Sequence, residues 1–139
     1  MSTWTAADAE RAFARATRAR RRASLMRRLR GCAACTRLAV FDALVPGSPG
    51  GRAGVREVPL DAIAGTVEPN RAEQFDPGFR PAARTRCRWQ RIWEAGERGA
   101  SLPPVSLVRV GDAYAVRDGH HRVSVAKARG AVAINAIVA

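Results

Sequence analysis

The 139 residues suffice for one domain with a hydrophobic core and are too few for two comfortable ones. The apolar fraction of 47% is ordinary for a globular protein, and no apolar run approaches membrane-spanning length or resembles a secretory signal, so we expect a cytoplasmic protein without a membrane partner. The net charge of +12 favours polyanionic partners, and residues 1–37, with ten arginines against two acids, contribute +8 of it.

Residues 1–45 are predicted to form a basic helical segment. Thr5 with Asp8 resembles a capping box, the Arg- and Ala-rich sequence continues to Arg30, and Gly31 is the expected stop. Large apolar residues are too few for a full core face. Three interpretations remain open. The segment is a solvated helix that docks by a narrow stripe, a segment that is partly disordered when alone, or a basic arm that contacts nucleic-acid phosphates. The arginines of such a basic arm are Arg18, Arg20, Arg21, Arg22, Arg27 and Arg28.

Residues 46–54 have the Pro/Gly composition of a linker, and the folded domain is predicted to span 55–139. A strand is expected over 55–60 and a long ordered loop over 65–81. The pattern from Arg84 to Arg98 is helical, with Trp89 and Trp93 as core anchors. Its other face adds three nucleic-acid candidates, Arg84, Arg88 and Arg91.

The remaining elements predict an α/β (α+β) fold with a small mixed sheet. Strands over 105–110 and 113–117 flank a two-residue turn of Gly111 and Asp112. A short helix over 123–129 ends at Gly130, and a final strand covers 132–138.

The most informative motif is the turn Asp118-Gly119-His120-His121-Arg122, between a predicted strand and the last helix. The first amides of a helix lack intrahelical partners and carry partial positive charge, so they hold anions well. Gly119 admits a close approach, Arg122 can grip phosphate with two donors, and the imidazoles can donate further hydrogen bonds.

Asp118 is negatively charged and would repel an anion at this site. It could cap the helix, orient a histidine or help hold a metal bound to ligand phosphates. We expect a phosphate-binding set of Gly119, His120, His121, Arg122 and Ser124, and catalytic candidates Asp118, His120 and His121. The simpler alternative is an ordinary helix cap with partly exposed histidines.

The cysteines do not predict a disulfide framework, because Cys32, Cys35 and Cys87 are few and odd in number. The Cys32–Cys35 pair lacks further ligands at zinc spacing, and it does not follow a strand as a redox pair would. We expect it to be chemically idle and predict no metal site made by the protein alone.

Residues 102–126 with the final strand, together with 55–63, resemble the ParB/sulfiredoxin superfamily. The resemblance covers roughly residues 55–139 and implies a nucleotide-phosphate-binding fold, with the 119–122 turn on the phosphate. ParB relatives bind and hydrolyse CTP, sulfiredoxins use ATP to repair an over-oxidised cysteine, and other relatives phosphorylate free serine. Here His120 replaces the sulfiredoxin cysteine, which argues against that repair. His120, His121 and Ser124 stand where partition-type ParB proteins have Glu, Arg and Arg.

Three functional hypotheses follow. The first is nucleotide binding with phosphoryl transfer or hydrolysis. In it, His121 stabilises developing charge, and Asp118 or an acid of the 65–81 loop serves as base or Mg²⁺ ligand. The loop acids are Glu68, Glu73 and Asp76. The second is a DNA- or RNA-binding module of low sequence specificity, with a nuclease variant. The third is a regulatory protein that retains only the fold.

Overall fold

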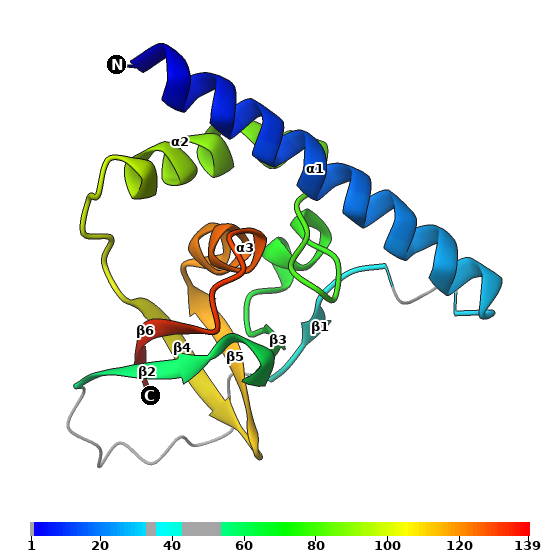
Figure 1. The fold of residues 1–139 in the computed structure, drawn as a ribbon. Coiled ribbons are helices and arrows are strands. Elements are labelled where there is room, and N and C mark those ends of the chain that lie inside the picture. Colours follow the sequence, from blue (N-terminus) through cyan, green and yellow to red (C-terminus); the bar gives the residue numbers. More distant parts are fainter. Residues whose placement is uncertain (1, 33–35, 43–53) are drawn as a thin grey trace.

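Three helices and one mixed sheet form the part of the chain that the computed structural model describes, residues 2–32, 36–42 and 54–139. The helices are α1 (Ser2–Leu29), α2 (Arg86–Glu97) and α3 (His120–Ala128). The strands are β1 (Ala39–Val40), β2 (Val55–Pro59), β3 (Ile63–Thr66), β4 (Val105–Val110), β5 (Ala113–Asp118) and β6 (Ala133–Val138). Figure 1 shows α1 along one side, α2 beside its N-terminal half, and α3 between these helices and the sheet. The predicted α/β fold with a mixed sheet is confirmed.

The sheet has the strand order β1-β3-β5-β4-β6-β2. β4 and β5 form the expected antiparallel hairpin, β6 is parallel to β4, and β2 is antiparallel to β6. On the other side of the hairpin β3 runs parallel to β5, and β1 runs parallel to β3. The carboxyl ends of β3 and β5 therefore meet at one edge of the sheet.

The prediction of a loop over 65–81 is wrong for its first two residues, because Gly65 and Thr66 belong to β3. Strand pairing on both sides stabilises this short strand despite its modest propensity. Gly65 allows a close approach to Ala39, whose carbonyl a Cβ would meet. The rest of the segment contains the 3₁₀ helices η2 (Pro69–Gln74) and η3 (Ala83–Thr85) and a bridge between Phe75 and Pro81.

Two helix boundaries also differ from the prediction. α1 begins at Ser2, so Thr5 lies inside the helix and does not cap it. α3 begins at His120 and not at 123, so the two histidines and Arg122 form its first turn. Of the predicted 46–54 linker, only Gly54 lies within the described residues.

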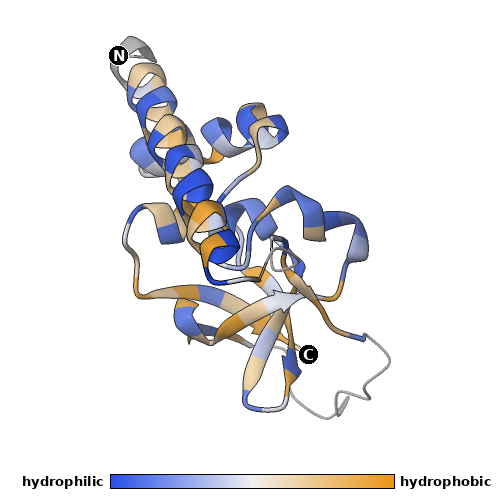
Figure 2. Ribbon diagram, turned by 90° about the vertical axis from the view of Figure 1, so that its right-hand side faces the viewer, coloured by the Kyte–Doolittle hydropathy of each residue, from blue (hydrophilic) through white to orange (hydrophobic). Residues whose placement is uncertain are grey.

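The helices pack through a second core beside the one under the sheet. Phe13, with Ala9 and Ala12, is buried against Trp89 and Trp93, and the Phe13 and Trp89 rings meet edge-on at 5.5 Å. The tryptophans are thus core anchors, as expected. Figure 2 shows hydrophilic and weakly hydrophobic bands alternating along α1, with strongly hydrophobic bands near its C-terminal end. Docking by a narrow stripe is confirmed for Ala9, Ala12 and Phe13.

Candidate functional site

The turn before α3 depends on a glycine in left-handed backbone. Gly119 has φ 102° and is the N-cap of α3, with no side chain capping the helix there. A Cβ at this position would lie 2.6 Å from Cγ1 of Val105, so a larger residue cannot be accommodated without movement. The Gly119 carbonyl accepts the first helical bond, from the Val123 amide at 3.0 Å. The preceding amides are those that a helix leaves without intrahelical partners.

His120 is buried beneath the turn at the carboxyl end of β3. Its Nε2 lies 2.6 Å from Oγ1 of Thr66, and its ring is stacked on Phe75. Burial, and then the charges of Arg71 and His121, lower the pKa of His120 to about 4. The imidazole is therefore neutral at pH 7 and acts as one donor and one acceptor.

His121 is also buried, with its ring edge-on to Phe75 at a centroid distance of 5.2 Å. Burial, then Arg88, then Arg71, lower the pKa of His121 to about 4. A role for His121 in stabilising developing charge would therefore have to rely on a neutral ring.

The Arg122 guanidinium is engaged inside the protein. Nη1 donates to the carbonyls of Pro103 (2.5 Å) and Pro104 (3.0 Å), and Nη2 pairs with the Asp118 carboxylate at 3.3 Å. Asp118 is otherwise exposed, at 76% of its side-chain surface, and it does not cap α3. Arg122 thus links the start of α3 to the segment before β4, and a bidentate grip on phosphate would require it to leave these carbonyls.

Two arginines from other elements complete the site. Arg71 of η2 and Arg88 of α2 line a small hollow together with the turn residues, Asp118 to Arg122, and Ile92. Its volume is about 30 Å³, far below the range of about 300–1,000 Å³ typical of small-molecule sites. Arg71 donates to Gln74, whereas Arg88 makes no hydrogen bond or ion pair with any described residue. Sequence reasoning missed Arg71 and assigned Arg88 to a nucleic-acid surface, because pairing of distant elements brings both to the turn.

Ser124 does not join the turn. It is buried, and its Oγ accepts a hydrogen bond from Nε1 of Trp89 at 2.9 Å. It also lines a groove between α1 and α3. Nothing in this geometry brings Ser124 onto an anion held by the 119–122 amides.

The loop acids have different surroundings. Asp76 is buried and accepts from the amides of Gly78 (2.9 Å) and Arg80 (2.8 Å) and from the Arg80 guanidinium. Glu73 is exposed and pairs with arginines, and Glu68 is exposed. Asp76 therefore acts as an internal anchor of its loop, which does not suit a catalytic base.

The predicted nucleic-acid arginines divide into engaged and free groups. Arg27 pairs with Asp76 at 3.8 Å, Arg84 pairs with Glu73 at 3.7 Å, and Arg20 is half-buried. The exposed arginines that make no hydrogen bond or ion pair with a described residue are Arg18, Arg21, Arg22, Arg28, Arg88 and Arg91.

Metal-binding chemistry finds little support among the described residues, where no three His, Cys, Asp or Glu side chains gather as a metal would require. Cys87 is a free, exposed thiol, and Cys35 lies outside the described residues, so the predicted idleness of the Cys32–Cys35 pair stays a prediction. None of the described helices combines the length and the apolar character needed to cross a bilayer.

Comparison with solved structures finds a sulfiredoxin from Arabidopsis thaliana that is similar to this chain. The alignment covers 62% of this chain and 84% of the sulfiredoxin, with 18% sequence identity and a TM-score of 0.43. The likeness is one of fold. At this identity and TM-score it carries no functional residue across. No protein-family profile and no curated protein sequence matches the chain.

Proposed function

We propose that this protein binds a small phosphate-bearing ligand, a nucleotide, with one phosphate at the turn formed by residues 118–122. The observation that carries the proposal is the meeting of the α3 N-terminus with Arg71 and Arg88 across one hollow. Helix amides and two guanidinium groups supply complementary charge from three elements. The position also suits a ligand, since α/β sheets commonly bind ligands beyond the carboxyl ends of their strands.

The neutral imidazoles fit this role as hydrogen-bonding groups. Burial, and then the neighbouring charges of Arg71 and Arg88, lower the pKa of both rings, because protonation of either would place a third cation beside these arginines. A bound phosphate would compensate that positive charge. Ligand binding is therefore expected to raise the pKa of both histidines from about 4.

The size of the site decides how the ligand lies. The hollow at the turn is too small to enclose a phosphate, so the group would sit at its mouth. A neighbouring groove of about 500 Å³ shares Ile92 and Arg122 with the hollow and continues between α2, α3 and β6. That volume falls in the range of small-molecule sites, so we assign the nucleoside to this groove. Mg²⁺ would be carried mainly by the ligand phosphates, with Asp118 as the one carboxylate in the described lining of the hollow.

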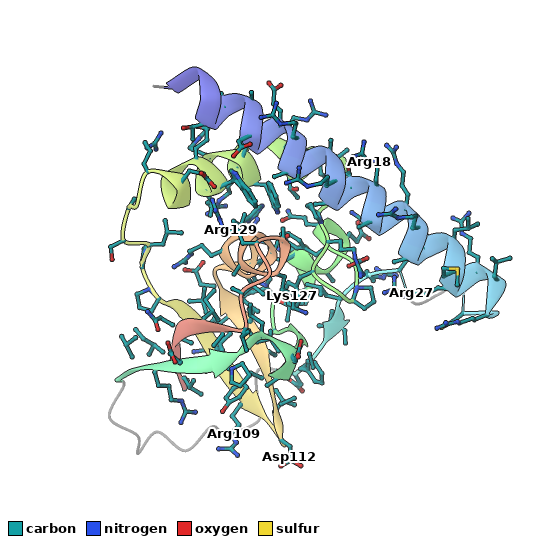
Figure 3. The ribbon with its side chains drawn as sticks, viewed as in Figure 1. Arg18, Arg27, Arg109, Asp112, Lys127 and Arg129 are labelled. Carbon is teal, nitrogen blue, oxygen red and sulfur yellow. The ribbon has the colours of Figure 1, made fainter. Side chains whose placement is uncertain are left out.

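The decisive experiment is calorimetric titration with ATP, ADP, CTP and GTP, each with Mg²⁺, using Arg88→Gln as the test variant. Arg88 is exposed and has no described partner, so its removal leaves the fold intact, whereas Arg122 also holds the segment before β4. Loss of the charge-assisted contacts should weaken binding by about tenfold or more. Arg109→Gln is the matched control, because Arg109 lies on the hairpin, far from α3 in Figure 3. The absence of saturable binding by every nucleotide, or an equal loss in the control, would refute the proposal.

A second function is favoured by the exposed arginines of α1, which suit non-specific contact with nucleic-acid phosphates. Salt separates the two functions. Binding to a polyanion should fall by orders of magnitude as salt rises, and it should weaken when Arg18, Arg21 and Arg28 become Gln.

A further inference from the structure

A groove of about 540 Å³ lies between α1 and α3. It is on the opposite side of α3 from the groove between α2, α3 and β6 to which the nucleoside was assigned. α1 contributes Ala12, Ala16 and Ala19, which recur at helical spacing and are too small to fill the space beneath the helix. Its other wall comes from α3 and from residues 78–80. We call this hollow the α1 groove.

The charged side chains that line the α1 groove are mostly positive. Arg15 and Arg22 come from α1, Arg80 from the loop and Lys127 from α3, whereas Asp61 is the one acidic residue in the described lining. Like charges gathered around a shared hollow repel one another, so their assembly is favoured by an anion between them.

Among the described residues, three of these four cations lack a direct ion pair. Arg15, Arg22 and Lys127 make no hydrogen bond or ion pair with any described residue, whereas Arg80 pairs with Asp76 at 3.3 Å. Lys127 is half-buried on α3, and its ammonium lies 5.5 Å from the ring centroid of Phe79. Figure 3 shows it in the region between α1 and the sheet. Burial, the largest effect, and Arg80 together lower the pKa of Lys127 by more than Asp61 and Asp76 raise it, so its charge is incompletely compensated.

We propose that the α1 groove binds a second small phosphate-bearing ligand, with Lys127 at its floor and Arg15 and Arg22 at its rim. Ser124, whose Oγ accepts from Trp89, is a further residue of the lining. The ligand class is a compact di- or polyphosphate or its organic ester. The volume suits such a molecule, and a nucleic-acid duplex is too wide to reach the half-buried Lys127.

The test uses Lys127 as its own reporter, since it is the one lysine in the sequence. The full chain is acetylated with an N-hydroxysuccinimide ester, with and without inorganic pyrophosphate, and the Lys127 peptide is quantified by mass spectrometry. We expect pyrophosphate to slow Lys127 acetylation by about fivefold or more, because a bound anion covers the amine and raises its pKa. The Arg15→Gln/Arg22→Gln variant should lose this protection.

Two controls make the result decisive. Arg18→Gln/Arg30→Gln removes the same charge from exposed positions outside the groove lining and should keep the protection. Arg88→Gln should also keep it, which separates the α1 groove from the turn. The proposal is wrong if wild-type Lys127 is not protected, if either control variant loses the protection, or if duplex DNA protects and pyrophosphate does not.

Discussion

Gly119 is the residue on which the geometry of the turn depends. Its φ of 102° is a conformation that L side chains rarely adopt, and Val105 of β4 lies directly against its Cα. These two constraints act together, because a side chain would both strain the backbone and collide with a buried valine. The glycine therefore fixes where α3 begins and where its first amides point.

Replacing Gly119 with Ala is expected to destabilise the protein by about 2–5 kcal/mol, from left-handed strain and overpacking combined. Gly111→Ala is a matched control, because Gly111 has φ 60° but a Cβ added there would meet nothing within 4 Å. It should cost about 1–2 kcal/mol. Urea denaturation measures both, and equal losses would show that contact with Val105 is unimportant.

The two histidines combine burial with nearby cations. Both have pKa values of about 4, below the ordinary 6.5, so they are neutral in the folded protein. An unfolded chain would protonate them as the pH falls below 6.5. Acid therefore favours the unfolded state. Through these two residues the free energy of unfolding falls as the pH drops from 6.5 to about 4, and it changes little below that.

We expect a shift from about pH 7 to about pH 5 to lower the free energy of unfolding by about 2–4 kcal/mol through these two residues. Chemical denaturation at a series of pH values measures the loss. The His120→Gln/His121→Gln variant should show a clearly smaller loss over the same interval. An unchanged pH dependence in that variant would contradict the assigned pKa values.

At the scale of elements, the segment between η2 and α2 is held by one buried carboxylate. Asp76 accepts two backbone amides of its own loop and pairs with Arg80 and with Arg27 of α1. It thus joins the loop to the C-terminal half of α1. Its buried position makes these bonds stronger than similar bonds at the surface.

Asp76→Asn should destabilise the protein by about 2–4 kcal/mol, because Arg27 and Arg80 lose their counter-charge. Glu73→Gln is the comparison, since Glu73 also pairs with two arginines, Arg37 and Arg84, but is exposed. That change should cost about 0.5 kcal/mol or less. Thermal and urea unfolding distinguish the two, and similar effects would contradict the anchoring role of Asp76.

For the whole molecule, the first half of α1 packs in the helix core, whereas its second half is tied to the rest of the protein through the ion pair of Arg27 with Asp76. Phe13 is 2% exposed in the core with the tryptophans, whereas Leu25 and Leu29 near the other end are exposed. Between these regions α1 passes over the α1 groove. Docking of this helix thus creates a cationic hollow that the sheet and α3 do not enclose by themselves.

Phe13→Ala is expected to lower the free energy of unfolding by about 3–5 kcal/mol, since a large buried ring is lost beside Trp89. Leu29→Ala removes an exposed side chain on the same helix and should change it by less than about 0.5 kcal/mol. Tryptophan fluorescence during denaturation reports on both. A small effect of Phe13→Ala would mean that α1 is not part of the cooperative core.

The sequence by itself determined the hairpin, the strand over β6, the helical character of α1 and α2, and the position of the turn. These depend on local periodicity, on Gly111 and Gly119, and on the unpaired amides that open any helix. Tertiary structure decided the rest. β3 exists because strands pair on both of its sides, the charge states of His120 and His121 follow from burial, and Arg122 is engaged by the Pro103 and Pro104 carbonyls. Arg71, Arg88 and the α1 groove emerged in the same way, because which charges meet and which remain unpaired depends on how distant elements pack.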